Sequence, residues 1–77
     1  MNSTLMNQLK LGMTTEQVTE ILGNSYTISQ NKIEDKKEIK ILSYRNSDEF
    51  YLFKFENNSL KSWNRELLLP TIETKQN

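Results

Sequence analysis

The sequence predicts an α+β domain in which two short N-terminal helices pack on one face of a three- to four-stranded antiparallel meander. Three observations lead to this class. The N-terminal third carries apolar residues at helical spacing, whereas the rest of the chain alternates apolar and polar residues. Turn-forming residues separate the alternating segments. Because an antiparallel sheet can keep one face in water, the helices are expected to cover only the other face.

A first helix is predicted over residues 2–11. Leu5, Met6 and Leu9 recur there at helical spacing. Gly12 then ends the helix and lets the chain turn at once into the next one. The two helices are therefore expected to form a compact αα corner.

The second helix, between Thr14 and Gly23, has both of its ends marked in the sequence. Thr14 is a good N-cap residue, and Gln17 lies three positions later, where it completes a capping box. Met13 and Val18 have the spacing of a hydrophobic staple. Gly23 supplies the left-handed residue that commonly closes a helix. The residues assigned to this structural motif are Gly12, Met13, Thr14, Gln17, Val18, Leu22 and Gly23.

Strands are predicted in the remaining two thirds of the chain. Residues 26–30 alternate weakly and predict a short strand, whereas the charge-rich stretch 31–38 is expected to be a solvated loop or hairpin tip. Three stronger strands are predicted at 39–45, 49–56 and 59–66. Asn57 and Asn58 join the last two, because both tolerate the positive φ that a two-residue hairpin turn requires.

The strand 49–56 has one strongly apolar side, made of Tyr51, Phe53 and Phe55, which is expected to receive the helices. If that side faces the helices, four large side chains are expected together on the opposite, open face. They are Tyr44, Phe50, Leu52 and Trp63. Exposed aromatic side chains of this kind mark a surface for a protein partner. The alternative is that the apolar segment 67–69, before Pro70, folds over them, and the sequence leaves both possibilities open.

Composition removes several function classes. The chain has no cysteine and no histidine, which excludes thiolate metal ligands and removes the commonest general base. Ten basic and ten acidic side chains cancel, so the basic surplus of a nucleic-acid-binding protein is missing. No apolar run is long enough to span a bilayer. We expect a non-catalytic protein without cofactor or metal, whose partner is another protein.

Two pairs of adjacent carboxylates occur, Glu34-Asp35 and Asp48-Glu49, and both fall at predicted turns. Solvated charge explains them better than a catalytic acid/base pair or a cation site.

Two sequence motifs resemble those of a known family. Residues 9–14, followed by Val18 and Leu22-Gly23, resemble the G-M-T-x-x-x-V-x-x-x-L-G opening of SmpA/OmlA (BamE-like) domains. Residues 53–60 resemble the F-x-F-x-(Asp/Asn)-Gly-x-Leu hairpin of the same domains. The β-lactamase inhibitor protein shares their fold of two helices on a sheet. The chain departs from the family pattern at Ser25 and Leu42, and it lacks the lipidation cysteine.

The resemblance implies a protein-interaction or scaffold domain of a bacterial envelope lipoprotein. Its location would be the envelope or periplasm if an export signal has been removed, and otherwise the cytoplasm. One alternative is a proteinaceous enzyme inhibitor of the β-lactamase-inhibitor type, which would have a protruding loop with an acidic tip, and Asp48-Glu49 is the best candidate for that tip. Another alternative is a small cytoplasmic domain without a defined role. We expect a single domain over 1–70 with a flexible tail at 71–77, present as a monomer or weak homodimer.

Overall fold

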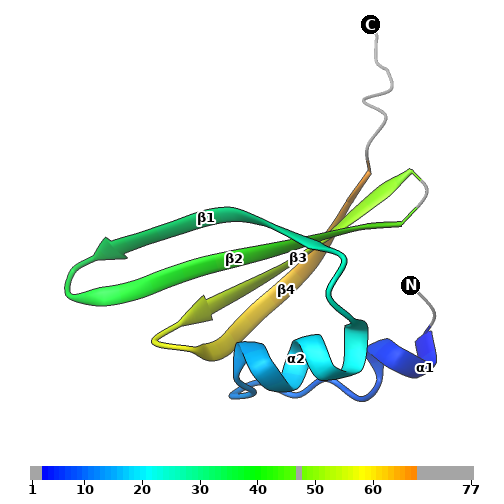
Figure 1. Ribbon diagram of the computed structural model, residues 1–77, viewed down its shortest axis with the longest axis horizontal. Helices are drawn as coiled ribbons and strands as arrows, with labels where there is room; N and C mark the ends of the chain where they lie inside the picture. The colour runs from blue at the N-terminus through cyan, green and yellow to red at the C-terminus, as the bar shows by residue number, and fades with distance from the viewer. Residues whose placement is uncertain (1–2, 47, 68–77) are drawn as a thin grey trace, which may run out of the picture.

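The computed structural model describes residues 3–46 and 48–67. Four strands form one antiparallel sheet in the order β1-β2-β3-β4, and both helical segments lie on the same side of it (Figure 1). The elements are α1 (Ser3–Met6), α2 (Thr15–Leu22), β1 (Tyr26–Glu34), β2 (Lys37–Asn46), β3 (Glu49–Glu56) and β4 (Ser59–Leu67). The predicted tail 71–77 and the segment 68–69 lie outside the described residues.

The predicted layer of two helices is wrong, because only α2 is longer than one turn. After α1, the amide of Leu9 donates to the carbonyl of Met6, three residues back, at 3.1 Å, so the α-helical pattern has ended. The amide of Gly12 then donates to Leu60 O at 2.8 Å, and the amide of Leu60 donates to Met13 O at 2.7 Å. These bonds hold the link between the helices against β4. Tertiary hydrogen bonds therefore override the helical spacing of the apolar residues.

Both ends of α2 have hydrogen bonds from the residues that flank it. The Thr14 hydroxyl accepts from Gln17 N at 3.1 Å, and Thr14 N donates to Gln17 Oε1 at 2.9 Å, which completes the capping box. At the other end, Gly23 N donates to Thr19 O at 2.7 Å. Gly23 has φ 97° and ψ −178° rather than left-handed helical angles, a region that essentially only glycine occupies.

The β3–β4 turn forms side-chain hydrogen bonds with the first turn of α2. Asn57 and Asn58 have φ of 51° and 59°, as expected for this hairpin. Asn58 Oδ1 accepts from Thr15 N at 3.0 Å and from Thr15 Oγ1 at 2.8 Å, and Asn58 Nδ2 donates to Glu16 Oε1 at 3.2 Å. A backbone hydrogen bond, followed by the one from Asn58, lowers the pKa of the Glu16 carboxyl. The turn residues thus hold the helix as well as reversing the chain.

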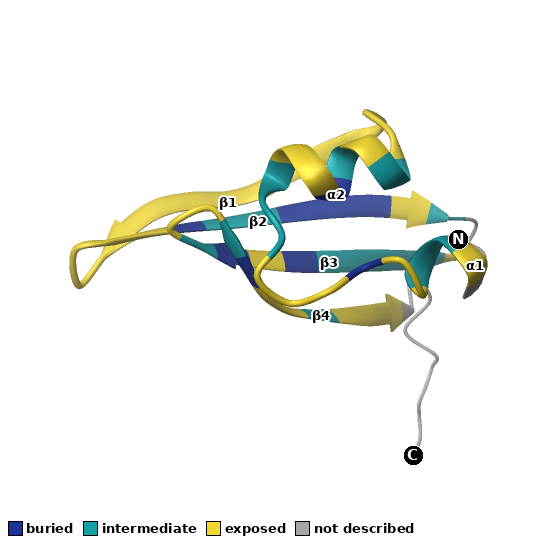
Figure 2. Ribbon diagram, turned by 90° about the horizontal axis from the view of Figure 1, so that it is seen from below, coloured by how far each residue is buried: buried dark blue, intermediate teal, exposed yellow. Residues whose placement is uncertain are grey.

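The charged stretch 31–38, predicted as a solvated loop or hairpin tip, is the tip of the β1–β2 hairpin, and most of it is strand. β1 continues to Glu34, and only Asp35 and Lys36, with φ of 52° and 65°, form the turn to β2. Every residue of β1 is exposed, and its end extends beyond α2 as an arm with β2 (Figure 2). Residues 37–44 of the ten-residue β2 pair with β1, with one register shift at Ser29, so backbone pairing stabilises a strand whose side chains show little β pattern.

The core lies between α2, the link that precedes it and one side of the sheet, called here the helix face. The buried side chains of this cluster are Leu9, Val18, Leu42, Tyr44, Phe53, Phe55 and Leu60. Val18, Phe53 and Phe55 are fully buried, so the apolar side of β3 receives the helix. Cross-strand partners share a face, and the register therefore assigns each remaining strand residue to the helix face or to the open face opposite.

Candidate functional site

Tyr44, predicted on the open face, lies on the helix face. It is paired with Tyr51 across the β2–β3 ladder and is only 3% exposed. Its hydroxyl donates to Gly23 O at 2.7 Å, and its ring meets Phe53 edge-on with centroids 5.7 Å apart. Burial, and secondarily the neighbouring Tyr26, raises the pKa of Tyr44 to about 12. Tyr44 is therefore part of the core, next to the C-terminal end of α2.

Trp63 also lies on the helix face, because a β-bulge breaks the strict alternation of β4. The register passes from Lys54 opposite Ser62 to Phe55 opposite Leu60, so Lys61 is the extra residue. Leu60 and Trp63, three positions apart, consequently share one face. Trp63 lies opposite Phe53 and packs, partly buried, against the core. The predicted placement of Trp63 on the open face is therefore wrong, because alternation along the sequence does not reveal a bulge.

Phe50 and Leu52 lie on the open face and form its partly exposed apolar centre near the β2–β3 turn. Each is the middle of a row that crosses three strands. The first row is Arg45, Phe50 and Glu66, and the second is Ser43, Leu52 and Asn64. An apolar centre with a polar rim on both sides is the usual composition of a protein-binding surface.

The far half of the open face carries charge instead. Glu56 forms ion pairs with Lys37 and Lys54, each with a nitrogen–oxygen distance of 3.9 Å. Ile39, which lies opposite Glu56, is only 5% exposed. The partly exposed apolar side chains of β2 and β3 on the open face are thus Phe50, Leu52 and Ile41, which lies opposite Lys54.

The two predicted acidic residues at the β2–β3 turn have different roles. Glu49 Oε1 accepts from Arg65 Nε of β4 at 2.9 Å, and the Glu49 side chain is 24% exposed. Asp48 is exposed and forms no ion pair within the described part of the chain. Of these two residues, Asp48 is therefore the one that is available to meet a positive group on a partner.

Sequence reasoning did not single out Arg65, Glu66 or Tyr26. Arg65 ends a row on the helix face that begins at Tyr26 and passes through Tyr44 and Tyr51, so all three tyrosines of the chain stand side by side. The rings of Tyr26 and Tyr44 are 5.8 Å apart. Only the strand register could have brought these residues together.

No pocket is found in the part of the chain that the structure describes, nor any group of three or more acidic, cysteine or histidine side chains that could hold a metal ion. Among the same residues, no helix is long and apolar enough to cross a membrane. The described residues instead form a surface that consists of Phe50 and Leu52 on the open face and Asp48 at the adjoining turn.

Comparison with protein families gives one match. The family model described as "Beta-lactamase inhibitor (BLIP)" matches residues 3–76, nearly the whole chain. The chain belongs to the β-lactamase inhibitor family. This is a family of proteins that bind and inhibit enzymes, so the expectation of a protein-binding, non-enzyme domain agrees with it. The SmpA/OmlA part of the resemblance has no such support, and an envelope lipoprotein role stays a prediction. Neither the curated proteins nor the solved structures give a significant match.

Proposed function

We propose that this domain inhibits an enzyme of the β-lactamase class by binding to it without covalent chemistry. The family assignment over residues 3–76 is the observation that carries the proposal. The binding surface is the β2–β3 end of the open face, with Phe50 and Leu52 as its apolar centre and Asp48 beside it. Burial of partly exposed apolar side chains against a partner supplies most of the binding free energy, and the polar rim supplies specificity.

The charge of Asp48 suggests how the domain stops catalysis. Asp48 lies at the turn between two paired strands, which positions its carboxylate at the end of a sheet rather than on a loose loop. A carboxylate presented in this way binds a cationic group of the target enzyme. Where that group belongs to the active site, the bound domain excludes substrate.

The test is inhibition of a panel of purified β-lactamases, followed with a chromogenic substrate. At least one enzyme is expected to be inhibited in a saturable, concentration-dependent manner. Phe50→Ala should weaken that inhibition by about tenfold or more, the loss typical of a central interface residue. Ile33→Ala is the matched control, because Ile33 is an apolar strand residue that is 72% exposed on the remote arm. No inhibition of any enzyme by the unaltered chain would refute the proposal.

Leu52→Asp tests the same surface by a different change. Leu52 is partly exposed on the open face, so a carboxylate there remains hydrated in the free domain but is stripped of water in a complex. The substitution should abolish inhibition while the thermal unfolding curve stays close to that of the unaltered chain. Retained inhibition would place the contact elsewhere.

An inhibitor must share a compartment with its target. We propose that the domain acts outside the cytoplasm, as expected if an export signal is removed. Fractionation of the native host, combined with the intact mass of the endogenous protein, tests this. A product found only in the cytosol and beginning at Met1 would contradict it.

A further inference from the structure

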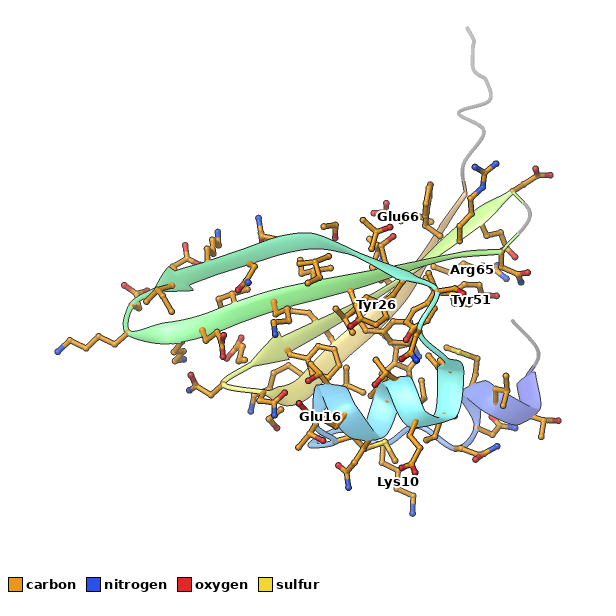
Figure 3. The ribbon with its side chains drawn as sticks, in the orientation of Figure 1. Lys10, Glu16, Tyr26, Tyr51, Arg65 and Glu66 are labelled. Atoms are coloured by element: carbon orange, nitrogen blue, oxygen red, sulfur yellow. The ribbon has the colours of Figure 1, made fainter. Side chains whose placement is uncertain are left out.

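The β1 strand forms one edge of the sheet, and β2 is its single neighbour among the described strands. Every one of its nine residues is exposed. Figure 3 labels Tyr26 at the end of β1 next to α2, and from there the strand extends away from both helices (Figure 1). The outer side of an edge strand presents a row of backbone N–H and C=O groups, with which another strand can pair.

Two isoleucines of β1 are exposed on the same face of the sheet. Ile28 is 48% exposed and Ile33 is 72% exposed. Ile28 lies opposite Leu42 and Ile33 lies opposite Glu38. These two β2 residues are four positions apart in a strand whose register with β3 is unbroken, so they and their partners share the helix face. The outer edge of β1 thus combines unpaired strand geometry with apolar surface that a neighbouring strand would cover.

A β-bulge makes β1 symmetric about Asn31. One residue, Ser29, is extra relative to β2. Asn31 and Ile28 are three positions apart in the sequence, but the β2 residues opposite them are only two positions apart. Asn31 and Ile33 are two positions apart, and so are their partners. The two isoleucines therefore lie at equal distances along the strand on either side of Asn31.

This symmetry makes the edge complementary to a second copy of itself. If the second β1 is antiparallel and related by a two-fold axis at Asn31, each Ile28 lies opposite Ile33 of the other copy. The remaining pairs join a charged residue to an uncharged one, namely Lys32 to Gln30 and Glu34 to Thr27. Apolar pairs stabilise neighbouring strands, whereas like charges directly opposite each other destabilise them. The register centred on Asn31 supplies the first and avoids the second.

Neighbouring registers are less favourable. A two-fold axis at Lys32 would place two ammonium groups opposite each other, and an axis at Gln30 would place Ile28 opposite the polar side chain of Asn31. Either shift also leaves one end of β1 without a partner. The axis at Asn31 pairs the whole strand.

We propose that two copies of this chain associate through β1, antiparallel and centred on Asn31, so that their four-stranded sheets join into one. A contact between identical surfaces about a two-fold axis closes at the dimer. Contact through one strand per copy is small, so the dimer is weak. The β2–β3 turn lies beside the Tyr26 end of β1, so the two turns are at opposite ends of the joined sheet. Self-association therefore goes beyond the proposed function and does not depend on it.

Sedimentation equilibrium between about 10 µM and about 1 mM protein tests the association. The mass should rise from 9.1 kDa toward twice that value and no further. Ile33→Lys places an ammonium group opposite Ile28 and should weaken dimerisation by about tenfold or more. Leu11→Lys is the matched control, because Leu11 is 65% exposed and lies outside the sheet, and it should dimerise like the unaltered chain.

Three results of this experiment would overturn the inference. They are a monomer at every concentration, a mass that grows beyond the dimer, and equal dimerisation of the two lysine variants. Growth beyond the dimer would indicate open-ended pairing of β1 with another surface. A chain that stays monomeric and still inhibits a β-lactamase would overturn the dimer alone and leave the proposed function standing.

The register is tested separately by disulfide formation, because the chain contains no cysteine. Asn31→Cys places two thiols directly opposite each other, with a Cα separation of about 4.5–5.5 Å that suits a disulfide. Lys32→Cys moves each thiol one position from the axis, which separates the Cα atoms by about 8 Å and prevents the bond. In a glutathione buffer Asn31→Cys should form a covalent dimer much faster than Lys32→Cys, and in urea the two rates should be equal. Equal rates under native conditions, or faster cross-linking of Lys32→Cys, would overturn the register centred on Asn31.

Discussion

Asn58 is the side chain through which the sheet holds α2, and replacing it by glycine tests this directly. Glycine adopts the positive φ of 59° without steric cost, so Asn58→Gly removes the side-chain hydrogen bonds and leaves the turn intact. Three bonds are lost, two from Thr15 and one to Glu16. One of the donors, Thr15 N, lies in the first helical turn, where amides have no partner within the helix.

The expected loss of stability follows from these bonds. Each contributes roughly 0.5 kcal/mol at an exposed site, the low end of the usual net value, so the sum is about 1.5 kcal/mol. For a domain of this size that corresponds to a Tm lower by roughly 6–12 °C in a thermal melt. Hydrogen exchange should also accelerate at amides of α2, including that of Val18, which donates to Thr14 O at 3.0 Å.

Asn57→Gly is the matched control for this change. Asn57 has nearly the same φ, but its side chain accepts a hydrogen bond from Glu38 N of β2, at 3.0 Å, rather than from the helix. It should lower the free energy of unfolding by about a third as much, because a single bond is lost. Exchange in α2 should stay unchanged. Equal destabilisation by the two variants, with α2 equally protected in both, would refute the role assigned to Asn58.

Two further predictions concern the C-terminal end of α2. The pKa of Tyr44 is raised to about 12 in the folded state, so its contribution to stability is complete below pH 10 and is lost as pH rises through 12. Between pH 10 and 12, denaturant unfolding should therefore show a smaller decrease in the free energy of unfolding for Tyr44→Phe than for the unaltered chain. Gly23→Ala should lower the free energy of unfolding by about 1–3 kcal/mol, because alanine is strained at the positive φ of 97°. Steric overlap adds nothing, since no neighbouring side chain or strand lies within 4 Å of the added Cβ. An unchanged urea midpoint would contradict this.

The elements that could be predicted from the sequence are those whose signals are local. Residues 15–22 are helical with the expected cap, and β3 covers 49–56 as expected, since capping chemistry and alternation of large apolar side chains act over a few neighbours. The turn at Asn57 and Asn58 belongs to the same group, because a tolerance of positive φ is a property of the residue itself.

The elements that sequence analysis missed depend on partners distant in the chain. The residues after Met6 have helical spacing, yet the link before α2 is held by backbone bonds to Leu60. The charged residues of β1 have a low β propensity, yet β2 pairs with them along the whole strand. In both places the deciding bonds join backbone groups, which carry no sequence signature. Side-chain patterns could not have indicated them.

The candidate site changed for a related reason. A single extra residue in β4, Lys61, moves Trp63 to the helix face, and the register does the same for Tyr44. Two of the four large side chains expected on the open face therefore belong to the core of a small domain. Phe50 and Leu52 remain, and both lie close to the turn that carries Asp48. The surface left for a partner is thus smaller than predicted and displaced toward one end of the sheet.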